Sequence, residues 1–100
     1  MVNYYVVYSR QAHKEKALLK AAGLDKKAQA LIGILAEDPF QNPPPYEKLL
    51  GNLAGSYSRR INLQHRLVYD VLPNTDKRKD EEGNLYKGVV HILRMWTHYE

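Results

Sequence analysis

The run DPFQNPPPYEKL, residues 38–49, holds four of the five prolines of the chain and constrains its fold more than any other segment. Proline has no backbone N–H to donate, and it restricts the residue before it, so neither a helix nor a central strand can continue through this run. We therefore expect a surface loop here. This loop divides the chain into a first part with helical patterns and a second part with strand patterns.

The first part predicts one strand followed by two helices. Residues 2–8 are β-branched and aromatic, as in strands, whereas residues 10–22 are rich in good helix formers. Ser9 is expected to cap the first helix and Gly23 to follow its end, and Asp25 is expected to cap a second helix. The second helix is indicated by apolar residues at helical spacing, namely Ala28, Leu31, Ile32 and Leu35.

The second part predicts three strands, at residues 57–62, 66–71 and 89–96. The last two are joined by the highly charged segment 73–88, PNTDKRKDEEGNLYKG, which is expected to form a long, solvated hairpin loop. Strands in hairpin succession pair antiparallel. The sequence therefore predicts a single α+β domain over residues 1–100, in the order β-α-α-β-β-β, with both helices on one face of a largely antiparallel sheet.

Composition excludes several classes of protein. The chain has no cysteine, so it can form neither a disulfide framework nor a thiolate metal site. His13 and His91 have no partner at the spacing of metal ligands, so no metal site is expected. No run approaches the roughly 18 apolar residues of a membrane helix, and the first residues do not resemble a signal peptide. These features predict a soluble, cytosolic protein without membrane contact.

The charge balance favours an anionic partner. Fifteen basic residues against eleven acidic ones give a net charge of +4 and an isoelectric point near 9.3. A small basic domain is attracted to RNA, to DNA or to an acidic protein. Charge alone does not choose among these partners.

Arginines concentrate in the strands after the proline run. Arg59 and Arg60 are neighbours, so they should point to opposite faces of the sheet, and one of them should share the open face with Arg66. Guanidinium groups on an open sheet face suit phosphate oxygens. The alternative is that these arginines form surface ion pairs with carboxylates such as Asp70, Glu81 and Glu82.

Residues 46–69, YEKLLGNLAGSYSRRINLQHRLVY, together with His-Tyr at 98–99, resemble the YoeB/Txe family of bacterial toxins in the RelE-like group. The features in common are an acidic residue before a turn, N-L-x-G-x-x-S-R-R-I, H-R-L-V-Y and the late His-Tyr. The resemblance implies the same order of strands and helices. The segment 73–88 is longer and more charged than the family pattern implies, and Glu100 is an additional residue after His-Tyr.

The resemblance implies a toxin of a type II toxin–antitoxin system that cleaves mRNA in the ribosomal A site. Such enzymes use no metal or other cofactor. In their reaction the 2′-hydroxyl of the RNA attacks the neighbouring phosphorus. The reaction needs a group that accepts the hydroxyl proton, a positive charge for the phosphorane and a group that protonates the leaving 5′-oxygen.

Residue by residue, Glu47 matches the general base of the family, Arg66 the arginine that stabilises the phosphate, and His98 the general acid. The plain alternatives are a surface glutamate at a turn and an exposed histidine near the end of the chain. Arg59 and Arg60 are expected to bind the RNA backbone. Tyr99 is expected to stack on a base or to pack on the sheet edge.

His65 precedes Arg66, so it should face away from it and serve the structure. The resemblance also implies partners: the ribosome with its mRNA, a cognate antitoxin with an acidic and poorly ordered tail, and operator DNA reached through that antitoxin. A homodimer is possible, through Trp96 or the first helix. Two other functions stay open, a toxin that acts on a protein such as DNA gyrase and a catalytically silent RNA-binding module.

Overall fold

The computed structural model describes residues 3–50 and 55–98, with Thr97 and His98 described by their backbone alone. The predicted order of elements is confirmed, with one short strand added directly after the prolines. In chain order the elements are β1 Tyr4–Tyr8, α1 Arg10–Ala21, α2 Asp25–Glu37, β2 Glu47–Lys48, β3 Ser56–Arg60, β4 His65–Leu72 and β5 Gly88–His98.

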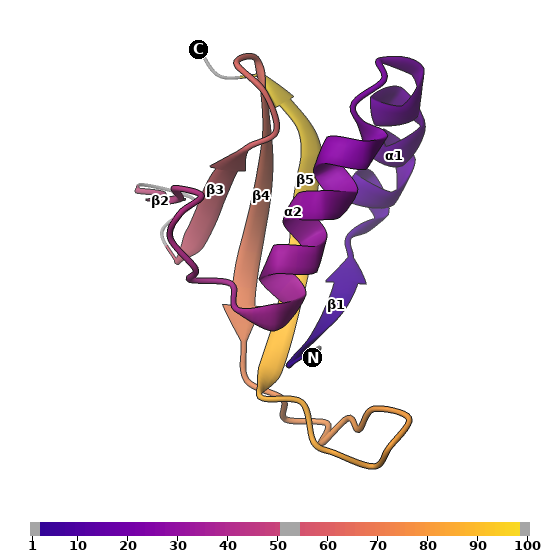
Figure 1. Ribbon diagram of the computed structural model, residues 1–100, viewed down its shortest axis with the longest axis vertical. Helices are drawn as coiled ribbons and strands as arrows, with labels where there is room; N and C mark the ends of the chain where they lie inside the picture. The colour runs from indigo at the N-terminus through magenta and orange to yellow at the C-terminus, as the bar shows by residue number, and fades with distance from the viewer. Residues whose placement is uncertain (1–2, 51–54, 99–100) are drawn as a thin grey trace.

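The strands form one sheet in the order β1-β5-β4-β3-β2, and α1 and α2 both lie on one of its faces (Figure 1). The pairs β2–β3, β3–β4 and β4–β5 are antiparallel, as predicted. β1 instead runs parallel to β5, from Tyr4 opposite Gly88 to Tyr8 opposite Ile92. A parallel pair requires a long connection, and here the connection consists of all the elements from α1 to β4.

The two helices begin differently. The Ser9 hydroxyl accepts a hydrogen bond from the Ala12 amide at 3.0 Å, which confirms the predicted cap of α1. The prediction that Asp25 caps α2 is wrong, because the cap residue is Leu24 and no side chain bonds the first turn. Asp25 is instead the first helical residue, where its negative charge favours the positive end of the helix dipole.

One hydrophobic core lies between the helices and the sheet. The predicted apolar stripe of α2 is buried and packs with Leu19 of α1. The sheet contributes Leu67 and Tyr69 from β4 and Ile92 from β5, each with no exposed surface. In the described part of the chain, no helix is long and apolar enough to cross a membrane.

α1 and its cap residue Ser9 also form hydrogen bonds at two register shifts in β5. The register between β4 and β5 shifts between Arg66 and Val68 and again between Val68 and Tyr69, each time with an extra residue in β5. An extra residue leaves backbone groups without a partner in the sheet. Ser9 donates its hydroxyl to the Leu93 carbonyl at 2.7 Å, beside the second shift.

Glu15 of α1 bonds the backbone of β5 at the first register shift. Its buried carboxylate accepts hydrogen bonds from the amides of Met95 at 2.8 Å and Trp96 at 3.2 Å, and it pairs with Arg94 at 2.9 Å. Burial acts to raise the pKa of Glu15, but the bonds from Arg94, the Met95 amide and Gln11 together lower it below its ordinary value. Glu15 is therefore a charged, fully bonded group between α1 and the end of β5.

The charged connection between β4 and β5 is the expected hairpin-like excursion. It contains one isolated bridge, Lys79 to Leu85, and the Asn74 amide donates to the carbonyls of Arg78 and Tyr86 at 3.0 Å each. It follows the last residue of β4, whereas Arg66 lies near the first, so the connection sits at the far end of the sheet from Arg66 (Figure 1).

Candidate active site

Glu47 and Arg66 meet on the face of the sheet that carries no helix. The Arg66 Nη1 atom lies 3.2 Å from Glu47 Oε2, and the same nitrogen donates to Ser58 Oγ at 3.2 Å. The Arg66 side chain is only 5% exposed, whereas that of Glu47 is 56% exposed. A buried cation thus faces a carboxylate that solvent, or a substrate, can reach.

The strand register explains why these side chains meet. Glu47 in β2 lies opposite Ser58 in β3, and Arg60 in β3 lies opposite Arg66 in β4. Residues opposite each other in antiparallel strands point to the same face, and so do residues two apart. The pairing of β2 with β3 therefore places the Glu47 side chain on the same face of the sheet as Arg66.

These residues line a cavity of about 270 Å³. We call it the Glu47–Arg66 cavity, and it is lined by Pro45, Tyr46, Glu47, Ser58, Arg60 and Arg66. It combines a carboxylate, guanidinium groups and a hydroxyl, which are groups that suit a phosphate and its neighbouring hydroxyls. Arg66 forms an ion pair with Glu47, a carboxylate that the ion-pair alternative did not name.

The third predicted catalytic residue is located only by its backbone. His98 is the last residue of β5 and pairs with His65, next to the pair of Arg66 with Thr97. The end of β5 therefore runs beside the strand segment that carries Arg66. The side chain of His98 and all of Tyr99 lie outside the described residues, as do residues 51–54 of the family motif.

The two neighbouring arginines point to opposite faces, as predicted. Arg60 is exposed and lines the Glu47–Arg66 cavity, so it is the one that shares a face with Arg66. Arg59 is only 1% exposed and reaches under the proline-rich loop. The expectation that Arg59 binds RNA stays untested, and its burial favours an indirect role.

His65 faces away from Arg66, as predicted. It is buried and its ring stacks on that of Trp96, with 3.9 Å between the ring centroids and 22° between the planes. Trp96 also packs against the core. This stack joins the start of β4 to the end of β5 on the face of the sheet that carries the helices, opposite the candidate site.

Sequence reasoning missed Ser58 as a site residue. Ser58 is buried and accepts the hydrogen bond from Arg66 that fixes the guanidinium beside Glu47. Strand alternation back from Arg60 identifies it, since residues two apart share a face. Among the side chains that the structure describes, no three of His, Cys, Asp or Glu gather in a way that would hold a metal ion.

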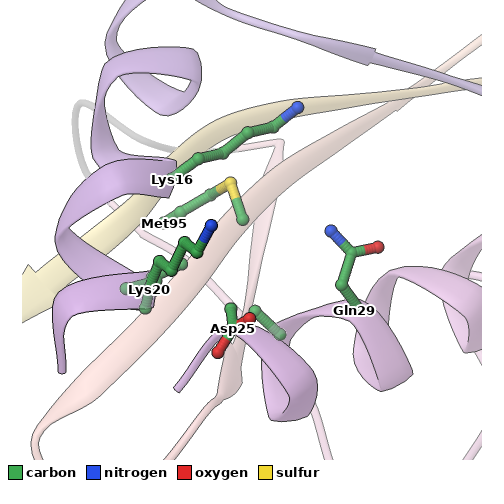
Figure 2. A pocket seen from close by; sticks show the side chains of 7 residues that line it. Lys16, Lys20, Asp25, Gln29 and Met95 are labelled. Carbon is green, nitrogen blue, oxygen red and sulfur yellow. The ribbon is translucent and has the colours of Figure 1, made fainter. Parts of the chain in front are cut away.

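A second cavity, of about 230 Å³, lies between α1 and α2 above Met95 of β5 (Figure 2). Its polar lining consists of Lys16, Lys20, Asp25 and Gln29. It lies between the helices and the sheet, and neither member of the carboxylate–guanidinium pair of Glu47 and Arg66 lines it. The Glu47–Arg66 cavity is therefore the better candidate for an active site.

Known proteins resemble the chain over most of its length. A family described as "YoeB-like toxin of bacterial type II toxin-antitoxin system" matches residues 8–99. Toxin YoeB of Synechocystis sp. is 48% identical over 46 residues, which are 46% of this chain and 54% of that protein. The matched stretch therefore spans about half the length of that relative.

Two solved structures from Staphylococcus aureus are similar over nearly the whole chain. The YoeB dimer has a TM-score of 0.69 and 26% identity, covering 97% of this chain and 99% of that one. The YoeB–YefM complex has a TM-score of 0.67 and 27% identity, covering 96% and 98%.

Two helices on one face of a five-stranded sheet, together with the similarity to the YoeB structures, give this protein the RelE-like fold of small bacterial toxins. Since the family match extends from residue 8 to residue 99, the chain belongs to the YoeB-like toxins of bacterial type II toxin–antitoxin systems. The resemblance drawn from residues 46–69 and 98–99 is confirmed.

Proposed function

We propose that this protein is an mRNA endoribonuclease that cleaves messages in the ribosomal A site by acid–base catalysis without a metal ion. The observation that supports this most directly is the contact of 3.2 Å between the exposed Glu47 carboxylate and the buried Arg66 guanidinium. A base and a fixed positive charge at this separation can act on one ribose and its 3′-phosphate together.

In the first part of the reaction, the Glu47 carboxylate accepts the proton of the ribose 2′-hydroxyl. The 2′-oxygen then forms a bond to the adjacent phosphorus, and the bond from phosphorus to the 5′-oxygen breaks. The products are a 2′,3′-cyclic phosphate and a 5′-hydroxyl end. Because Glu47 is exposed on the rim of its cavity, an RNA strand can reach it without a movement of the sheet.

Arg66 would stabilise the negative charge that develops on the phosphoryl oxygens. A guanidinium held in place before substrate arrives needs no reorganisation in the transition state, and burial strengthens its field. Ser58 contributes by holding the Nη1 atom, and the neighbouring strands β3 and β5 hold the backbone of Arg66 on both sides. Arg60, on the same cavity, would bind a neighbouring phosphate.

His98 would give its proton to the leaving 5′-oxygen. Imidazole changes its charge near neutral pH, so it can donate a proton at the end of the reaction and regain one afterwards. The role comes from the family resemblance, and the position of the His98 backbone beside the Arg66 pair is compatible with it. Tyr99 would stack on a base next to the cleaved bond.

The partners follow from the family. A YoeB from Staphylococcus aureus occurs in a complex with YefM, and another structure shows a YoeB dimer. By analogy, this chain would bind an acidic, poorly ordered antitoxin, reach operator DNA through it and be able to form a homodimer. Its substrate places its action on cytoplasmic ribosomes, and the reaction described needs no cofactor.

The proposal is tested by mapping 5′ ends in cellular mRNA after induction of the toxin, and in purified ribosomes that carry a defined message. We expect new ends within the codon in the A site. Glu47→Ala and His98→Ala should remove these ends. Glu81→Gln, an exposed carboxylate in the distant connection, is the matched control and should leave them.

Other outcomes would point elsewhere. Intact messages together with DNA damage would indicate a protein target such as DNA gyrase. Intact messages with retained ribosome binding would indicate a silent RNA-binding module. Cleavage that persists in both the Glu47 and the His98 variants would contradict the assigned roles.

A further inference from the structure

The Arg59 guanidinium is a buried cation surrounded by acceptors of one loop. Its Nη2 donates to the carbonyls of Pro39 at 3.0 Å and Gln41 at 2.8 Å, and its Nη1 donates to that of Pro44 at 2.6 Å. Its Nε donates to the Tyr69 hydroxyl at 3.2 Å. In the described residues, no carboxylate lies within 4.0 Å of Arg59, so neutral dipoles hold its charge.

The same loop is secured by Tyr69 of β4. The Tyr69 hydroxyl accepts from Arg59 and donates to the Pro39 carbonyl at 2.7 Å, and its ring stacks on Tyr57 with 5.6 Å between centroids. Burial raises the pKa of Tyr69, while the Arg59 hydrogen bond acts in the opposite direction. The loop carbonyls thus accept hydrogen bonds from two side chains of the sheet, Arg59 of β3 and Tyr69 of β4.

A proline-rich loop has few other ways to hold its shape. Pro43, Pro44 and Pro45 have no N–H to donate, so the loop cannot form a regular hydrogen-bonded element of its own. Its carbonyls therefore need donors from elsewhere, and the planar fork of an arginine offers several at fixed angles. A lysine ammonium has no such fork.

Glu47 follows this loop directly. Only Tyr46 and Pro45 separate the carbonyl of Pro44, which Arg59 bonds, from the Glu47 backbone, and Arg59 also lies over the Tyr46 ring at 5.0 Å. β2 itself is two residues long, which is too short to fix a side chain by its own pairing. The position of the Glu47 carboxylate thus depends on where the loop is held.

From these contacts we infer that Arg59 is a positioning residue: it clamps the loop of residues 39–46 and thereby sets the Glu47 carboxylate against Arg66. The inference rests on the proposed function for its kinetic consequence, but its structural part stands independently. Arg59 and Arg60 then serve one site from opposite faces of β3, with Arg60 on the cavity and Arg59 beneath the loop.

The first arm of the test needs no activity. Native-state hydrogen exchange is measured for Arg59→Lys, for Tyr69→Phe and for the matched control Arg10→Lys, an exposed arginine at the start of α1. The amide of Leu49, which bonds to the Ser56 carbonyl at 2.9 Å, reports on β2. We expect Arg59→Lys to lose protection at Leu49 while amides of the β4–β5 pair keep theirs.

The second arm measures cleavage of a message on purified ribosomes. A displaced base should lower kcat by about 10²-fold and leave KM nearly unchanged, because misplacement affects the transition state more than binding. Tyr69→Phe, which removes one of the loop's anchors, should show the same pattern to a smaller extent. Arg10→Lys should match the unmodified protein in both arms.

Three outcomes would overturn the inference. One is unchanged protection at Leu49 with unchanged kcat in Arg59→Lys. Another is a rise in KM alone, which would indicate that Arg59 binds RNA. The third is global loss of protection in both Arg59→Lys and Tyr69→Phe, which would make Arg59 a support of the whole fold. If the unmodified protein cleaves no RNA, the proposed function fails while the exchange arm still decides the role of Arg59.

Discussion

The pair of Glu47 and Arg66 is asymmetric, and the asymmetry determines what each substitution does. Removal of one member of a buried ion pair is costly because it leaves an uncompensated charge inside the protein. Here the carboxylate that would remain after loss of Arg66 is 56% exposed, so water can solvate it. Loss of the arginine should therefore affect chemistry far more than stability.

We predict that Arg66→Ala lowers kcat for mRNA cleavage by about 10²–10³-fold, the usual effect of removing one preorganised charge donor. The free energy of unfolding should fall by only about 1 kcal/mol, a typical value for a single substitution. Kinetics on programmed ribosomes and urea unfolding measure the two effects. Unchanged cleavage would exclude the role given to Arg66.

Two glycines offer a contrast at the same scale. A methyl group added at Gly88 would meet the Leu72 carbonyl oxygen at 2.9 Å and the Tyr4 ring at 3.0 Å, whereas one added at exposed Gly33 in α2 would meet nothing within 4 Å. Gly88 is buried where β1, β5 and β4 adjoin. The backbone oxygen there cannot move aside as a flexible side chain would.

We predict that Gly88→Ala destabilises the protein by about 1–3 kcal/mol through overpacking. Gly33→Ala should instead stabilise it by about 0.5–1 kcal/mol, because alanine is the better residue inside a helix. Thermal unfolding of the two variants under one condition compares them directly. Equal shifts in Tm would contradict the packing of the sheet described above.

At the scale of elements, α1 functions as a brace for β5. Ser9 and Glu15 provide the hydrogen bonds that the irregular register of β5 lacks, and they do so at two successive shifts. Bulges redirect the side chains that follow them. The direction of the last part of β5, which ends at His98, thus depends on a carboxylate in a different element.

The lowered pKa of Glu15 gives a prediction about pH. A carboxyl group whose pKa in the folded state lies below its ordinary value of 4.5 stabilises the fold fully above that value. This contribution is lost as the pH falls through the folded-state pKa, when the carboxylate becomes protonated. Glu15→Gln should therefore be less stable than the unmodified protein at pH 7 by about 1–3 kcal/mol, and the difference should narrow in acid.

Urea unfolding of both proteins from pH 7 down to pH 3 measures this dependence. Glu81→Gln, a change of an exposed carboxylate, is the control and should follow the unmodified protein throughout. A difference between Glu15→Gln and the unmodified protein that stays constant with pH would show that the charge of Glu15 is not what braces β5.

Sequence patterns predicted the elements in which apolar or charged residues recur at a regular spacing, and missed the features that have no such spacing. The apolar stripe of α2 and the opposite directions of Arg59 and Arg60 followed from spacing alone. β2 was missed because two residues after a proline run show no alternation. The clamp under the loop was missed because an arginine in a basic motif gives no sign, in sequence, of the carbonyls that surround it.

For the molecule as a whole, one core joins the two helices to the sheet. Residues of α1, α2, β4 and β5 belong to a single buried cluster, against which the only tryptophan, Trp96, packs. The pairing of β1 with β5 could not be derived from local pattern, because parallel neighbours far apart in sequence are chosen by tertiary packing. A domain organised in this way should unfold as one unit.

We predict that urea unfolding monitored by Trp96 fluorescence and by far-ultraviolet circular dichroism gives coincident transitions. Fluorescence reports on the stack of Trp96 with His65 at the end of the sheet, and dichroism reports mainly on the helices. Separate midpoints would show that the end of β5 detaches before the core melts, and would contradict a single cooperative unit.

The strand that joins the helical part to the remaining strands is also the last to be made. β5 lies between β1 and β4 in the sheet. Until β5 has left the ribosome during synthesis, β1 therefore has no strand to pair with. Pairing of elements so distant in sequence is also slow. The pairing of β5 with its two neighbours, which completes the sheet, is therefore a late step in the folding of a nascent chain.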